Sequence, residues 1–134
     1  QRMEPPKEPL VLMRRSFQKA EMKPGKVVVL YFAAQSCPQC RGFTAALKRF
    51  FELLKSSGKP VEVIYISGDA SEAEFRTSFS REHGDWLAVD WQCSSWREGM
   101  KKQYGVAQLP TLLVLDEKGE TVVSDAMRDV RGAQ

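Results

Sequence analysis

An unbroken run of β-branched and aromatic residues, Lys26 to Ala33, constrains the fold more than any other part of the chain. Its apolar residues do not alternate with polar ones, which predicts a strand buried on both faces. A second run of this kind extends from Val61 to Ser67. Between the two runs, from about Cys37 to Ser57, apolar residues recur at helical spacing and predict a long amphipathic helix. The order strand, helix, strand predicts a parallel pair in an α/β domain.

Residues that favour helix ends support this division. Ser36 is expected to cap the long helix, since Pro38 fits its first turn and Gly58 marks its end. Ser71 and Glu74 have the spacing of a capping box and predict a second helix from Ser71 to His83.

The second half of the chain continues the alternation. A short apolar run, Trp86 to Val89, precedes a predicted helix from Ser95 to Tyr104. Two apolar runs, residues 111–116 and 121–123, flank the turn-forming residues 117–120 and predict a terminal hairpin. The proline-rich residues 1–25 are expected to form a tail and lead-in to a single domain over residues 26–134.

The composition argues against several classes of function, among them nucleic-acid binding and membrane association. The 134 residues are 43% hydrophobic, enough for one cored domain, which we expect to be monomeric. The 20 basic and 17 acidic residues are spread along the chain, so no nucleic-acid partner is expected. The chain has no apolar run near 20 residues and no signal peptide, so no membrane association is expected. We expect a cytoplasmic location. A mitochondrial one is the alternative, because the chain starts at Gln1 and not at Met, which leaves open a removed targeting segment upstream.

Two of the three cysteines, Cys37 and Cys40, lie at the start of the predicted long helix. Residues three apart on a helix share a face, so the pair can close a disulfide or release it with little backbone movement. Cys37 faces the positive end of the helix dipole, which favours the thiolate, and is the predicted nucleophile. Cys40 lies one turn deeper and is the predicted resolving thiol.

A zinc site is the alternative use of this spacing. It would need two further ligands, and the only other Cys and His are Cys93 and His83, ten residues apart. We therefore expect no metal and no cofactor. Cys93 is interpreted as a small apolar filler, His83 as a solvated helix end, and Trp91 as a loop residue that is a candidate for an exposed binding surface.

Leu109 and Pro110 directly precede the predicted strand at 111–116. A proline there cannot donate to a ladder, and its peptide bond is able to be cis at little cost. Such a loop presents a backbone edge to a substrate peptide. Leu109, Pro110 and the two residues between the cysteines, Pro38 and Gln39, are the predicted substrate-binding residues.

The segment Tyr31 to Thr44 resembles the pattern Y-F-S-A-S-W-C-P-P-C-R-G-F-T of the tryparedoxin and nucleoredoxin branch of the thioredoxin-like superfamily. The resemblance continues through residues 63–69, 86–89, 104–106 and 109–111 and covers roughly residues 26–130. It implies a thioredoxin-like fold, a central mixed β-sheet flanked by helices with a terminal hairpin. It also implies a thiol–disulfide oxidoreductase that reduces protein or small-molecule disulfides and is itself reduced by a low-molecular-weight dithiol or a protein. In tryparedoxins it further implies electron flow from trypanothione to peroxidases.

The chain departs from this pattern at two positions beside the cysteines. Ser36 replaces the Trp before the nucleophile, and Gln39 replaces the second Pro. The family's Trp places a flat apolar ring beside the nucleophilic sulfur, and this chain lacks that ring. Its loss favours an alternative function, a thioredoxin-like binding module with little or no turnover. Tyr31 stands where other thioredoxins carry a buried acid, so Asp69 is a candidate substitute, with a simple helix-leading acid as the alternative. The helix that closes a thioredoxin fold after the hairpin is expected to be absent.

Overall fold

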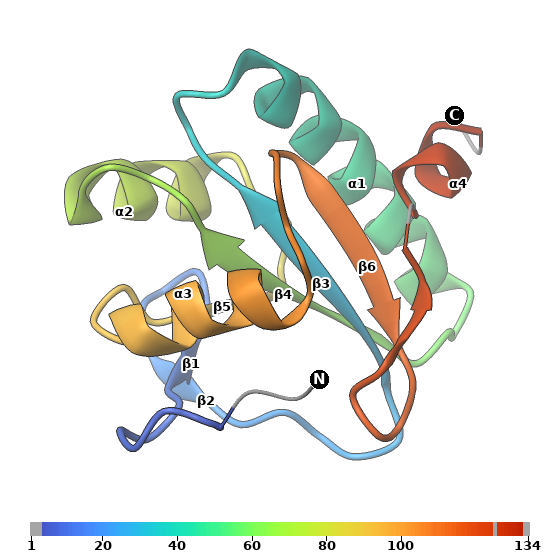
Figure 1. Ribbon diagram of the computed structural model, residues 1–134. Coiled ribbons are helices and arrows are strands. Elements are labelled where there is room, and N and C mark those ends of the chain that lie inside the picture. The colour runs from blue at the N-terminus through green and yellow to red at the C-terminus, as the bar shows by residue number, and fades with distance from the viewer. Residues whose placement is uncertain (1–3, 125, 133–134) are drawn as a thin grey trace.

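The protein folds around one seven-stranded β-sheet with helices on both faces, as the computed structural model, which describes residues 4–124 and 126–132, shows (Figure 1). The elements, in chain order, are β1 (Leu12–Met13), β2 (Lys19–Ala20), β3 (Val27–Ala33), α1 (Pro38–Ser56), β4 (Val61–Ser67), α2 (Glu72–Arg81), β5 (Leu87–Val89), α3 (Ser94–Gln103), β6 (Thr111–Leu115), β7 (Thr121–Val123) and α4 (Met127–Gly132). Within the described residues, none of these helices is long and apolar enough to cross a membrane.

The sheet is mixed, with strand order β2-β1-β5-β4-β3-β6-β7. Strand β3 lies parallel to β4 over its whole length, from Val27 opposite Val61 to Ala33 opposite Ser67. On its other side β3 is antiparallel to β6, and β6 and β7 form the predicted hairpin. The predicted parallel pair and mixed sheet are confirmed.

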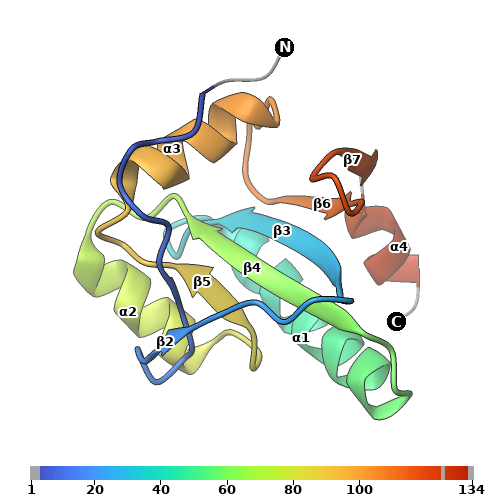
Figure 2. The same cartoon turned by 90° about the horizontal axis from the view of Figure 1, so that it is seen from below.

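Helices α1 and α2 cover one face of the sheet and α3 covers the other, as seen in Figure 2. Successive residues of β3 enter two separate cores: Tyr31 packs on the α1 and α2 side, whereas Leu30 and Phe32 pack on the α3 side. Both faces of β3 are therefore apolar, which explains the absence of alternation in its sequence.

The N-terminal segment differs from the expected lead-in, because part of it joins the sheet. Strand β1 pairs antiparallel with β5, so that Leu12 lies opposite Val89, and β2 pairs with β1. Between them, Phe17 packs edge-on against Phe75 and Phe79 of α2 at centroid distances of 6.4 and 6.2 Å. Strands of two residues carry no periodic signal, so only the tertiary structure reveals them.

The closing helix, expected to be absent, is present as α4. It packs against α1, with Ala126 and Val130 buried in the core on that side. The guanidinium of Arg131 lies 5.4 Å from the ring centroid of Phe43. Six residues are too few to give a convincing helical period in sequence, and the packing on α1 supplies the missing stability.

His83 is buried, and its interpretation as a solvated helix end is wrong. It is 2% exposed and lies against the rings of Tyr31, Tyr65, Phe79 and Trp86. Its Nδ1 accepts a hydrogen bond of 3.1 Å from the indole N–H of Trp86. Burial, and then the positive charge of Arg15, lower the pKa of His83 to about 3, so the imidazole is neutral at physiological pH.

This buried imidazole predicts an acid-sensitive fold. In the unfolded chain His83 takes up a proton near pH 6.5, whereas in the native state it does so only near pH 3. The stability that its neutral form contributes is present above pH 6.5 and is lost as the pH falls below that value. The free energy of unfolding should therefore decrease by about 1.4 kcal/mol per pH unit, or about 2 kcal/mol at pH 5. Urea unfolding of the native protein and of His83→Gln between pH 7.5 and 4.5 checks this, since the variant should lack that part of the slope. Equal slopes would contradict it.

Candidate redox site

The site forms where β3 ends and α1 begins. The link Ala34 to Ser36 leads into Cys37, which is the N-cap of α1, not Ser36 as predicted. Cys37 has extended backbone angles, and its Sγ accepts the backbone N–H of Cys40 at 3.2 Å. Its own N–H donates to the carbonyl of Ala34 at 3.3 Å. The nucleophile predicted from sequence is thus itself the capping group, and the N–H aimed at its sulfur stabilises negative charge there.

The two cysteines have different environments, and both are free thiols in the structure. Cys37 is half-buried at the surface, whereas Cys40 is 1% exposed. Burial, followed by the hydrogen bond with Cys37, raises the pKa of Cys40 to about 12. One sulfur is therefore accessible to a partner and the other is shielded and protonated, as a nucleophile and a resolving thiol require.

The loop before β6 lies beside Cys37. The Leu109–Pro110 peptide bond is cis, the isomer that the sequence left open for this bond, and the carbonyl oxygen of Leu109 is 3.9 Å from the Sγ of Cys37. Because β6 pairs with β3 from Thr111 onward, sheet pairing places this loop next to the start of α1.

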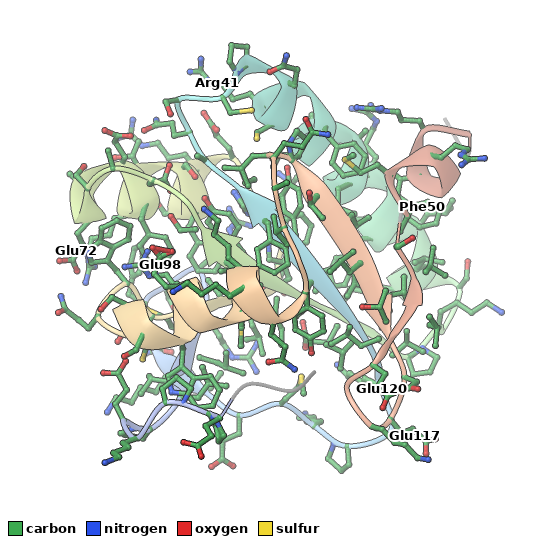
Figure 3. The ribbon with its side chains drawn as sticks, in the orientation of Figure 1. Arg41, Phe50, Glu72, Glu98, Glu117 and Glu120 are labelled. Atoms are coloured by element: carbon green, nitrogen blue, oxygen red, sulfur yellow. The ribbon has the colours of Figure 1, made fainter. Side chains whose placement is uncertain are left out.

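The two residues between the cysteines, Pro38 and Gln39, are exposed. The side-chain oxygen of Gln39 accepts from the Cys37 thiol at 3.7 Å. In Figure 3, Arg41 marks this end of the molecule, opposite the β6–β7 turn that carries Glu117 and Glu120. The structure thus gathers Pro38, Gln39 and Leu109 around Cys37, whereas Pro110 is buried. Their role in binding a substrate stays a prediction.

The buried side chain of Tyr31 contacts the first turn of α1 and belongs to the site. The sequence alone assigns it no role there. The hydroxyl of Tyr31 donates to the carbonyl of Cys40 at 3.2 Å and shares a 2.5 Å hydrogen bond with the hydroxyl of Thr44. Burial raises the pKa of Tyr31 well above its usual value, so it remains a neutral hydrogen-bonding group. It fixes the backbone of the first turn of α1 and offers no proton acceptor to Cys40.

The residues considered for a zinc site do not come together. Cys93 is buried on the α3 side of the sheet, where its thiol donates to the carbonyl of Pro9 at 3.6 Å. His83 is buried among aromatic rings that belong mainly to the α1 and α2 side. Among residues 4–124 and 126–132, no three His, Cys, Asp or Glu side chains form a cluster that could hold a metal ion.

Trp91, the loop residue considered as a candidate for an exposed binding surface, is half-buried. Its ring stacks on Phe75 at 6.1 Å and lies 4.0 Å from the guanidinium of Arg97. These contacts show a packed side chain held between α2 and α3.

Comparison with known proteins agrees with the fold and the site. A family model described as thioredoxin-like matches residues 25–121. Nucleoredoxin from Xenopus laevis is 32% identical over 126 residues, which are 91% of this chain and 30% of that protein. Tryparedoxin from Trypanosoma brucei brucei is 35% identical over 104 residues, which are 78% of this chain and 70% of that protein. The chain thus spans about a third of the length of the nucleoredoxin it matches.

The solved structure of tryparedoxin I from Leishmania major superimposes with a TM-score of 0.84 at 33% identity, covering 92% of this chain and 85% of the other. With the family model, the relatives and this likeness in agreement, the chain belongs to the tryparedoxin and nucleoredoxin branch of the thioredoxin-like family.

Proposed function

We propose that the chain is a thiol–disulfide oxidoreductase domain that reduces protein or small-molecule disulfides by dithiol exchange at Cys37 and Cys40. One observation carries this proposal: the half-buried Sγ of Cys37 accepts the N–H of Cys40 at 3.2 Å and faces the carbonyl of Leu109 at 3.9 Å. The sulfur is therefore accessible, lies at the positive end of α1 and has a backbone edge beside it for a substrate peptide.

The reaction balances as two successive exchanges. The Cys37 thiolate attacks one sulfur of the substrate disulfide, forming a mixed disulfide and releasing the other substrate sulfur as a thiolate that takes up a proton. The Cys40 sulfur, losing its own proton, then attacks the Cys37 sulfur. This step closes the Cys37–Cys40 disulfide and releases the second substrate thiol. Two electrons and two protons pass to the substrate, and an external dithiol returns the pair to its reduced state.

We propose a low-molecular-weight dithiol or a protein dithiol as that reductant. A tryparedoxin II whose structure was solved in complex with glutathionylspermidine is 25% identical to this chain, with a TM-score of 0.84. A cysteine pair that donates electrons must be kept reduced, so we propose a reducing compartment, the cytoplasm or the mitochondria. The exchange uses both cysteines of one chain, so we propose that the domain acts as a monomer.

Trapping the intermediate tests this function. The Cys40→Ser variant should form a covalent adduct with insulin through Cys37, because the second exchange is blocked. Non-reducing electrophoresis should show the adduct, and dithiothreitol should release it. The Cys37→Ser/Cys40→Ser double variant is the matched control and should form none. If the single variant also forms no adduct, the proposed exchange is wrong.

Exposed Ser36, in the position of the family's tryptophan, supports a second candidate, a binding module with little turnover. In that case the double Cys→Ser variant would bind disulfide-free partner peptides as tightly as the native protein does. Under the first proposal the cysteines contribute to capture, and the double variant should bind a disulfide substrate more weakly.

A further inference from the structure

A buried carboxylate lies next to the redox site. Asp69 is the second residue after the end of β4 and is 6% exposed. One oxygen, Oδ2, accepts from the hydroxyls of Tyr65 at 2.9 Å and Ser67 at 2.6 Å. The backbone N–H of Asp69 donates to the Ser67 hydroxyl at 3.0 Å, which closes the turn. Burying a carboxylate costs free energy unless hydrogen-bond donors surround it. The two hydroxyl groups supply such donors and fix the position of the Asp69 carboxylate.

The other oxygen of Asp69 reaches the link that carries the nucleophile. Oδ1 accepts the backbone N–H of Gln35 at 2.5 Å. Gln35 is two residues before Cys37, and the neighbouring N–H of Gly68 donates to the carbonyl of Ala33 at 2.8 Å. Two hydrogen bonds from the end of β4 therefore fix the short link between β3 and α1, and that link determines where the Cys37 sulfur lies.

The charge of Asp69 also acts on Cys40. Burial is the largest cause of the raised pKa of Cys40, and the negative charges of Cys37 and Asp69 act in the same direction. Arg97 partly balances Asp69, and its guanidinium is anchored on the carbonyls of Ser67 at 3.3 Å and Trp91 at 3.0 Å.

We propose that Asp69 is a positioning residue of the redox site, which holds the link before Cys37 through the Gln35 N–H. Its negative charge acts on the same site, because it opposes a second negative charge at Cys40. This inference rests on the proposed function. The hydrogen bond sets the direction of the attacking sulfur, and the charge adds to the burial that keeps Cys40 a thiol while Cys37 reacts. Asp69 does not touch the reacting atoms, and its effect passes through Gln35 and through the electrostatic field at Cys40.

Two variants separate the hydrogen bond from the charge. Asp69→Asn retains an acceptor for the Gln35 N–H and removes the charge, whereas Asp69→Ala removes both. For insulin reduction we expect kcat/KM to fall about threefold or less in Asp69→Asn and about ten- to hundredfold in Asp69→Ala, mostly in kcat, because misplacement of the sulfur slows attack more than binding. In both variants the rate of Cys40 alkylation by iodoacetamide relative to that of Cys37 should rise about tenfold, measured by mass spectrometry of the separated peptides. In Asp69→Asn, which retains the acceptor for the Gln35 N–H, a merely structural role would not shift that ratio.

Ser67→Ala is the matched control, since it removes one bond to Oδ2 and leaves the charge and the Gln35 bond. Its alkylation ratio should stay within twofold of the native value. Because Asp69→Ala can lose its fold, circular dichroism is recorded for each variant, and the isosteric Asp69→Asn then decides through the alkylation ratio. Native ratios in a folded Asp69→Asn, or a native kcat/KM in a folded Asp69→Ala, would overturn the inference.

Native protein and Cys37→Ser are measured in parallel. If native protein reduces insulin no faster than Cys37→Ser, the proposed function itself fails. If native protein is active and the Asp69 variants match it, only the role of Asp69 fails.

Discussion

Replacing Cys37 with serine should lower the rate of insulin disulfide reduction by at least about a thousandfold, to the level of the double Cys37→Ser/Cys40→Ser variant. The reason is that the other two cysteine thiols, Cys40 and Cys93, are both buried. Cys40 is buried, and burial raises its pKa to about 12, so it cannot replace Cys37 as the attacking thiolate. The measurement is the steady-state rate with dithiothreitol as the reductant, corrected for the reaction of dithiothreitol alone.

The third cysteine provides a matched control for this prediction. Cys93 is 5% exposed and lies in the core on the α3 side of the sheet, so Cys93→Ser should leave the rate within twofold of the native value. In Cys40→Ser the mixed disulfide formed by Cys37 is resolved only by dithiothreitol, so turnover should be slower than in the native protein and should depend on the dithiothreitol concentration. A loss of activity in Cys93→Ser as large as that in Cys37→Ser would show that the redox pair has been assigned wrongly.

The elements that sequence predicted well are those with strong local patterns. Strands β3 and β4 are unbroken apolar runs, and α1 has a clear helical period. The spacing of the two cysteines at the start of α1 predicts a redox-active pair. Each of these signals is contained in a few neighbouring residues. Because α1 connects β3 and β4, the two strands are expected to be parallel neighbours with α1 packed on one face of the sheet.

The features that sequence missed depend on residues far apart in the chain. Choosing between Ser36 and Cys37 as the helix cap requires the backbone angles of the preceding link, which Asp69, more than 30 residues away, holds through Gln35. An acidic residue shortly after a strand is equally consistent with an exposed and with a buried carboxylate. The burial of Asp69 was therefore not predictable from the residues next to it. His83 is a similar case, because its aromatic surroundings come from β3, β4, α2 and the residues before β5.

Truncating Trp86 to alanine should cost about 3–5 kcal/mol of the free energy of unfolding, the largest effect on stability that we expect from a single side chain in the core. Trp86 is 1% exposed, and its ring packs edge-on against Phe51 at a centroid distance of 5.5 Å. A Cβ atom placed on Gly84 would lie only 2.6 Å from the indole, so the ring lies directly on backbone at that position. Backbone in a packed core moves little, and the cavity left by truncation would therefore stay largely unfilled.

The loss in Trp86→Ala also has a polar part, which a second variant isolates. The indole N–H donates to Nδ1 of His83 at 3.1 Å, and without it a buried acceptor is left unpaired, at a cost of about 1–3 kcal/mol. Trp86→Phe keeps most of the ring and removes this donor, so it should cost about 1–2 kcal/mol, and the difference between the two variants measures the packing alone. Val122→Ala, at an apolar position that is 58% exposed, should change stability by less than about 0.5 kcal/mol in the same urea titration. Because a domain of this size has a total stability of about 5–15 kcal/mol, Trp86→Ala should leave it only marginally folded. A cost below about 1 kcal/mol would mean that the indole does not fill the core at Gly84 and Phe51.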